Sequence, residues 1–277
     1  MKFTINKQSL CVGLLSASLI LPMSGCSSTT EAGAVGANRK QLLLVSSEEI
    51  LALSNQAYQQ TLAQARQAGK LDVDTAQVAR LRRIANRLIP HTTIYRPDAG
   101  MWRWEVHSIK DNTINAYVMP GGKIVFYSGI IDRLQLSDAE IAAIMGHEMA
   151  HALREHSREK MSRSVATSSM IGIASAALGL SSGQAELASL AGSVGLDLPH
   201  SRTQESEADK IGLELMARAG YNPSSAITLW RKMQRVDGSS SPPQFLSTHP
   251  SSESRIKQIQ ALLPSVNPLY QSAINKR

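Results

Sequence analysis

Two histidines four positions apart, with a glutamate directly after the first, have the spacing best suited to chemistry in this sequence. They are His147, Glu148 and His151. Because residues i and i+4 lie on one face of a helix, both imidazoles can point at a single metal ion. Glu148 lies about a third of a turn away, where it can reach a water molecule without binding the metal. This arrangement predicts zinc-assisted hydrolysis.

The alternative interpretation is a surface helix with two histidines and an acid on its polar side. The residues around the motif are apolar, namely Ile141, Ile144, Met145 and Leu153. This pattern predicts a buried helix. Buried imidazoles need polar partners, which a metal ion would supply.

A third metal ligand is expected, because catalytic zinc sites generally have three protein ligands and one open position. Glu205 and Asp209 are four residues apart, and Gly212 follows one turn later, where a close helix crossing would need a residue without a side chain. We predict that Glu205 binds the metal and that Asp209 accepts the second N–H of a ligating histidine. Glu207 lies roughly 200° around the helix from Glu205, so both cannot reach one ion. The alternative is a solvated acidic helix start, favoured by the helix dipole.

The composition is that of a globular protein, since 43% of the 277 residues are hydrophobic and 18% are charged. Aromatic residues are scarce at 4%, which favours packing of helix on helix over a large sheet. The formal charge is +7, but the basic residues are scattered among acids without a basic run. No nucleic-acid site is therefore predicted.

Residues 1–25 resemble a bacterial lipoprotein signal peptide: a positive start, an apolar core, and small residues before Cys26. Cys26 would become the lipid-bearing first residue of the mature chain. Ser27 in the next position favours the periplasmic side of the outer membrane. The alternative is an ordinary secretory leader. Residues 26–46 are small and polar and predict a flexible tether, and residues 47–277 would form one folded domain.

The pattern of the remaining chain predicts an α+β fold that is mainly helical. Helices are expected over 47–68 and 74–88, followed by two or three strands between residues 95 and 127. One of these strands could pair with an extended substrate, or the strands could form only a core hairpin. Residues 165–180 carry no charge and predict a buried or lid-forming helix, with a membrane span over 165–198 as the alternative.

Together these motifs resemble the zinc metallopeptidase family of the CAAX prenyl proteases and HtpX. The resemblance rests on the motif from His147 to His151 and the motif from Glu205 to Asp209. It also rests on Asn115, on the Pro-Gly-Gly turn at 120–122 and on the stretch 247–255. It implies a zincin-like catalytic domain with a small sheet beside the motif helix, one zinc ion per chain, and Glu205 as a ligand. The leader indicates the periplasmic lipoprotein branch that includes LoiP.

The resemblance also implies that His249 and Arg255 line the cleft as catalytic residues. His249 or Arg255 could stabilise the oxyanion, or His249 could occupy the open zinc position in a resting state. His156, five residues after His151, is turned away from the ligand face and is interpreted as structural.

Three functions are compatible with these observations. The first is an envelope protease, anchored in the membrane through Cys26, that degrades misfolded or stalled outer-membrane proteins. The second is an envelope chaperone or assembly factor with a mostly shut zinc site. The third is an integral-membrane protease of the same family.

Overall fold

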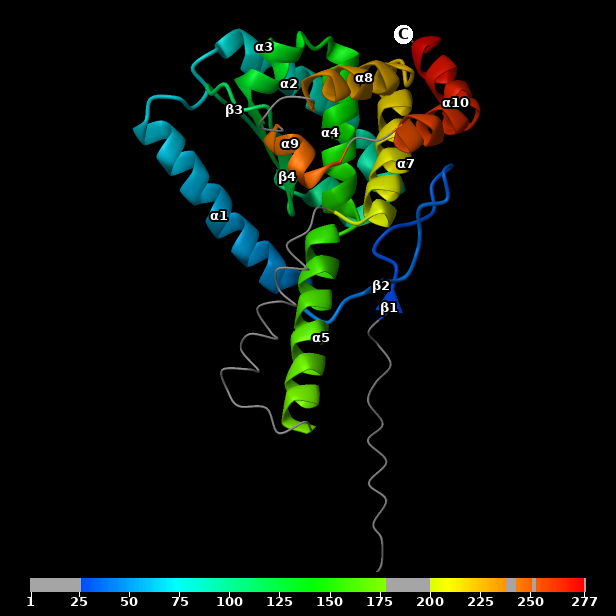
Figure 1. The fold of residues 1–277 in the computed structure, drawn as a ribbon. Coiled ribbons are helices and arrows are strands. Elements are labelled where there is room, and N and C mark those ends of the chain that lie inside the picture. Colours follow the sequence, from blue (N-terminus) through cyan, green and yellow to red (C-terminus); the bar gives the residue numbers. More distant parts are fainter. Residues whose placement is uncertain (1–25, 178–199, 238–242, 251–252, 277) are drawn as a thin grey trace, which may run out of the picture.

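The computed structural model describes residues 26–177, 200–237, 243–250 and 253–276. It is mainly helical with small sheets, so the predicted fold class is confirmed (Figure 1). The helices are α1 (Ser47–Gln67), α2 (Thr75–Leu88), η1 (Ile89–Ile94), η2 (Pro97–Met101), α3 (Ser128–Leu134), α4 (Asp138–Leu153), α5 (His156–Ala177), α7 (Arg202–Arg218), α8 (Ser225–Asp237), α9 (Gln244–Thr248) and α10 (Glu253–Ile274). The strands are β1 (Cys26–Ser27), β2 (Gln41–Leu42), β3 (Glu105–Ile109), β4 (Ala116–Met119) and β5 (Lys123–Tyr127).

Helix α4 carries the two-histidine motif through the centre of the molecule. It begins at a capping box, in which the Ser137 side chain accepts from the backbone of Glu140 and Glu140 reaches back to Ser137. From Glu140 to Leu153 every residue is buried, because α2, α7, α8 and strand β4 pack around this helix. The prediction of a buried motif helix is confirmed.

Helices α4 and α7 cross at two glycines. A Cβ atom on Gly212 would lie 2.7 Å from the backbone nitrogen of His147, and one on Gly146 would lie 2.9 Å from the carbonyl oxygen of Gly212. Any side chain here would force the helices apart, so the role predicted for Gly212 is confirmed. The crossing places α7 beside α4 (Figure 1), and Glu205 near the start of α7 comes close to both histidines of α4.

The larger sheet has the order β3-β5-β4, with β3 parallel and β4 antiparallel to β5. The turn at 120–122 lies between β4 and β5, and both of its glycines have positive φ, as a tight turn requires. Side chains of α1 cover one face of this sheet, while the other face joins the main core with α2 and α4. Within the described residues β4 forms an edge of the sheet, close to α4.

The N-terminal segment differs from the predicted tether. Strand β1 pairs with β2, Gln41 and Ala37 are buried, and the backbone N–H of Ala34 donates to Glu214 on α7 at 2.8 Å. The small polar residues of this segment suggested a flexible chain, but they pack against the ends of α4, α5 and α7. The boundaries predicted for the leader and the folded domain stay predictions.

The uncharged stretch 165–180 is described only in part. Residues up to Ala177 continue helix α5, which projects from the body of the molecule (Figure 1), and residues 178–199 lie outside the described parts of the chain. In the ranges that the structure describes, none of the helices is long and apolar enough to cross a membrane.

Candidate metal centre

The three predicted ligands converge between α4 and α7. The Nε2 atoms of His147 and His151 are 3.1 Å apart, and the Glu205 carboxylate oxygens lie 3.5 Å from the first and 3.3 Å from the second. Zinc–ligand bonds of ~2.0 Å in a tetrahedron place neighbouring donor atoms ~3.3 Å apart. Two imidazoles and a carboxylate are also the ligand types of catalytic zinc sites, so the residues present fit a zinc ion.

Asp209 and Arg255 fix the position of the His147 ring through its Nδ1 side. The Nδ1 atom of His147 lies 3.1 Å from Oδ1 of Asp209, as predicted for the acceptor of a ligand's second N–H. The Arg255 guanidinium donates to both oxygens of Asp209, at 2.6 and 2.8 Å, and also pairs with Glu205. Burial would raise the pKa of Asp209, but Arg255 and His147 outweigh it and the pKa is lowered. The carboxylate therefore stays ionised.

Arg255 is itself fixed in place. Its guanidinium lies 3.7 Å from the centroid of the Trp230 ring and is almost fully buried. The structure thus places Arg255 beside two carboxylates of the centre, where it positions Asp209 and Glu205. Its predicted contact with a substrate oxyanion stays a prediction.

Glu148 lies on the same helix as the ligands but outside the donor cluster. Its Oε1 atom is buried and finds no hydrogen-bond partner in the described chain, with Nε2 of His249 3.3 Å away. Burial raises the pKa of Glu148, and the charges of His249 and His147 oppose the rise. A carboxylate with a raised pKa suits a group that must accept a proton and then release it.

His249, at the end of α9, completes the donor cluster. Its Nδ1 atom lies 2.9 Å from Oε1 of Glu205 and 3.4 Å from Nε2 of His147, and all four donors fall within 4.8 Å of one another. Of the two roles predicted for His249, this position matches the fourth donor of a resting state. A small cavity of about 10 Å³ lies beside His147, on the side of Asp209 and Trp230.

Comparisons with known proteins agree with this geometry. The model of peptidase family M48 matches residues 75–263. The chain belongs to this family. The match includes both helices of the metal centre together with His249 and Arg255, and it confirms the predicted peptidase class.

The M48 chain is similar to several named metalloendopeptidases. It is 42% identical over 163 residues to the mitochondrial metalloendopeptidase OMA1 of Schizosaccharomyces pombe, covering 58% of this chain and 47% of the relative. It is 28% identical over 275 residues to OMA1 of Bos taurus, covering 94% and 50%. With the beta-barrel assembly-enhancing protease of Escherichia coli it shares 29% over 170 residues, covering 58% and 34%. The chain thus spans half or less of the length of these relatives.

Two further histidines of the M48 chain surround His151, and neither was predicted to contact the centre. Nδ1 of His156 lies 2.8 Å from Nδ1 of His151, and the ring of His200 lies 4.1 Å from that of His151. Positions five residues apart on one straight helix would not meet, but α4 ends at Leu153 and α5 starts at His156. The chain turns between them, which helical spacing alone could not reveal.

Glu207 lies outside the candidate donor cluster, as its place on the helix predicted. Its carboxylate pairs with Arg39, Arg154 and His156, at 2.9 to 3.1 Å. Glu205 and Glu207 therefore have separate partners, and of these two only Glu205 faces the donor cluster.

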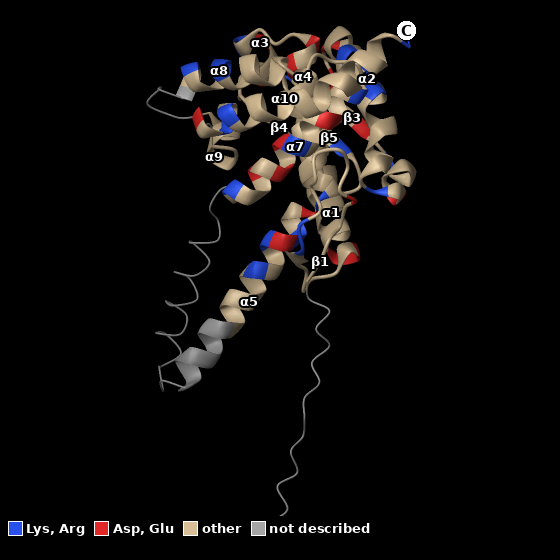
Figure 2. Ribbon diagram, turned by 90° about the vertical axis from the view of Figure 1, so that its right-hand side faces the viewer, with Lys and Arg blue, Asp and Glu red and all other residues tan. Residues whose placement is uncertain are grey.

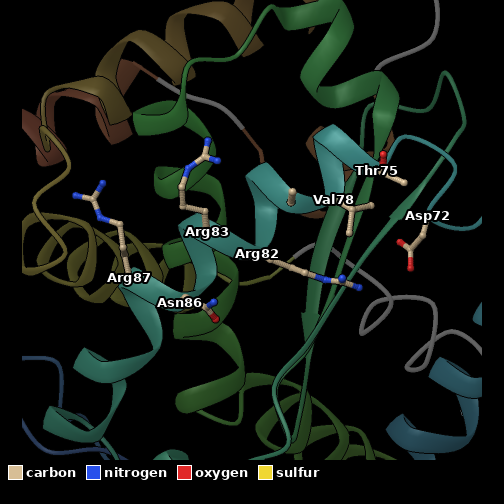
Figure 3. Close-up of a pocket in the computed structure, with 8 residues that line it drawn as sticks. Asp72, Thr75, Val78, Arg82, Arg83, Asn86 and Arg87 are labelled. Atoms are coloured by element: carbon tan, nitrogen blue, oxygen red, sulfur yellow. The ribbon is translucent and has the colours of Figure 1, made fainter.

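The pocket in Figure 3 lies on the outer face of α2 and has a volume of about 650 Å³. Arg82, Arg83 and Arg87 line it together with Asp72. It shares none of its lining residues with the metal centre, so it takes no part in the chemistry considered below.

Proposed function

We propose that this M48 peptidase is a zinc-dependent endopeptidase of the bacterial cell envelope, with one zinc ion per chain. The observation that carries the proposal is the set of His147, His151 and Glu205, with the buried carboxylate of Glu148 beside it. A site used only for binding would not need a buried acid next to the first ligand.

Zinc, when bound, would lower the pKa of a water molecule and polarise the scissile carbonyl group. Glu148 accepts a proton from the attacking water and delivers it to the leaving amine. Asp209 and Arg255 keep His147 and Glu205 oriented. Once His249 moves aside from Glu205, its N–H can stabilise the oxyanion, with Arg255 as the other candidate donor.

Unfolded or misfolded envelope proteins are the proposed substrates. Strand β4 is an edge of the sheet and packs beside α4, so an extended peptide could add to it by main-chain hydrogen bonds. Such bonds select for an extended backbone more than for a particular side chain. This suits a peptidase that removes stalled or misfolded chains of varied sequence.

The periplasmic side of the outer membrane is the proposed location, with Cys26 as the lipid anchor. The support comes from the leader sequence and from the similarity to the beta-barrel assembly-enhancing protease of Escherichia coli, whereas the OMA1 relatives are mitochondrial. In the structure Cys26 is exposed at the start of β1, where a lipid could be attached.

Metal removal tests the proposed chemistry. The purified full chain is expected to contain one zinc per molecule and to cleave casein, an unfolded protein. A chelator should abolish cleavage, because without zinc the attacking water is not activated. One equivalent of zinc should restore it. A protein that holds zinc and binds casein without cleaving it would instead support the chaperone alternative.

Replacing Cys26 with serine tests the anchor. The variant is expected to move from the membrane fraction to the soluble periplasmic fraction, because serine cannot carry the thioether-linked lipid. Carbonate extraction of both forms provides the measurement, and Ser28→Ala serves as the matched control near the same site. A Cys26→Ser protein that still resists carbonate extraction would contradict lipid anchoring and favour a membrane-embedded protease.

A further inference from the structure

The two ligating histidines of α4 are supported differently. His147 has a carboxylate directly on its Nδ1 atom, that of Asp209, which Arg255 clamps. His151 has no such carboxylate within the described chain; its Nδ1 atom instead lies 2.8 Å from Nδ1 of His156. Any carboxylate that supports His151 must therefore act through His156.

The contacts of His156 allow one assignment of protons. His151 needs a lone pair on Nε2 to bind a metal, so its hydrogen lies on Nδ1 and is donated to Nδ1 of His156. A neutral imidazole that accepts at Nδ1 carries its hydrogen on Nε2. That nitrogen lies 3.1 Å from Oε2 of Glu207, which accepts the hydrogen bond. Each group in the line thus has a defined donor or acceptor role.

Glu207 is held in turn by two arginines. Arg154 donates to its Oε1 atom at 3.1 Å, and Arg39 donates to both of its oxygens, at 2.9 and 3.0 Å. The pKa of Glu207 is lowered to about 2 because His156 and these arginines outweigh the effect of burial. Arg39 belongs to the N-terminal segment and also makes two bonds to the fully buried Glu159 on α5.

We propose that His156 and Glu207 are positioning residues for the metal ligand His151, and that Arg39 anchors them from the N-terminal segment. The line from His151 through His156 to Glu207 fixes the tautomer and the ring orientation of His151, as Asp209 does for His147. The segment after Cys26 is then part of the support of the metal centre. Figure 2 shows both acidic and basic residues on the start of α5 and on α7, and hydrogen bonds between His156 and Glu207 and between Gln204 and Glu159 join the two helices.

A second metal ion shared by His151, His156 and His200 is the competing interpretation, since their donor atoms also lie within 4.8 Å of one another. His151 has one lone pair in its neutral form, and the centre with His147 and Glu205 uses it. Binding a second ion would require His151 to lose its remaining hydrogen and the bond to His156. The hydrogen-bonded line needs neither step.

The inference rests on the proposed zinc site and is tested by zinc affinity, measured by competition with a chromophoric chelator. His156→Leu is expected to weaken zinc binding by about 10- to 100-fold, the usual cost of losing an outer partner of a ligand. His156→Gln should recover most of this loss, because one amide group offers both an acceptor and a donor. Arg39→Gln should cause a smaller loss, below about tenfold, since Arg154 still holds Glu207.

Arg163→Gln is the matched control. Arg163 also pairs with Glu159, at 2.7 Å, but the structure gives it no contact with Glu207 among the described residues. This variant should bind zinc as the wild type does. The visible spectrum of the cobalt-loaded proteins is a second readout, because it reports ligand geometry and should shift for His156→Leu and not for Arg163→Gln.

Thermal unfolding of the metal-free proteins separates positioning from folding. A folded His156→Leu variant with wild-type zinc affinity would overturn the proposal, as would a His156→Gln variant that binds zinc as weakly as His156→Leu. If the leucine variant does not fold, the Arg39→Gln variant provides the test, because the Arg39 side chain is partly exposed and its replacement should not prevent folding. Wild-type zinc affinity in Arg39→Gln would overturn the role of the N-terminal segment. A wild-type chain that binds no zinc would refute the proposed function instead.

Discussion

Replacing Glu148 with glutamine is expected to abolish peptide hydrolysis while zinc stays bound. The amide keeps the shape of the side chain but cannot accept a proton from the attacking water. General acid–base groups contribute about 10²- to 10⁴-fold to rates, so kcat on casein should fall by at least about 100-fold. The measurement combines casein cleavage with metal analysis of the same sample.

Two controls make the Glu148→Gln result specific. Glu48→Gln removes a charge from an exposed position of α1 and should leave cleavage unchanged. The inactive variant should also retain its substrates, so envelope proteins co-purified with Glu148→Gln but not with the wild type would identify them. Undiminished casein cleavage by a zinc-loaded Glu148→Gln protein would refute the assignment of Glu148 as the base.

Replacing Glu205 with alanine is expected to remove zinc from the purified protein. Glu205 is the one negatively charged residue among the three predicted ligands. Its carboxylate also pairs with Arg255 and contacts His249. Its loss should lower the zinc affinity by more than ~100-fold, which is the upper end of the effect of removing a residue that only hydrogen-bonds to a ligand. Zinc content after dialysis, together with chelator competition, provides the measurement.

Glu207→Ala is the matched comparison on the same helix. Its carboxylate faces Arg39, Arg154 and His156, so the variant should lose at most the smaller share of affinity expected for an outer partner. At micromolar protein and zinc it should remain loaded. A Glu205→Ala protein that keeps zinc while Glu207→Ala loses it would mean that the wrong carboxylate was assigned.

Much of the centre follows from helix geometry and could be predicted from the sequence. His147 and His151 on one face, Glu205 and Asp209 on another, and a glycine where the two helices cross are all local relations with a period of 3.6 residues. The capping residues Ser137 and Glu140 and the turn at 120–122 are local in the same sense. Such features depend on neighbours within one or two turns, so residue types and spacing suffice to predict them.

The order of the strands and the closure of the site depend on contacts between distant segments. The parallel pairing of β3 with β5 could not be predicted from either strand alone, because the residues of one strand do not specify which strand it pairs with or in which direction. His249 is 102 residues from His147, and only the packing of α9 against the core brings it to the donors. A histidine before a proline gives no sign of this on its own.

The N-terminal segment shows most clearly the difference between what local sequence predicts and what tertiary contacts decide. Its composition is that of a linker, and a flexible tether was the reasonable prediction, yet Arg39 and Gln41 reach buried groups on α4, α5 and α7. The sequence by itself was enough to predict the peptidase class, which the family match confirms, and the candidate ligands, because these predictions depend on spacing within single helices. The support of His151 was decided by tertiary structure, because it requires a turn at residue 154 and an arginine far away in the chain to meet one carboxylate.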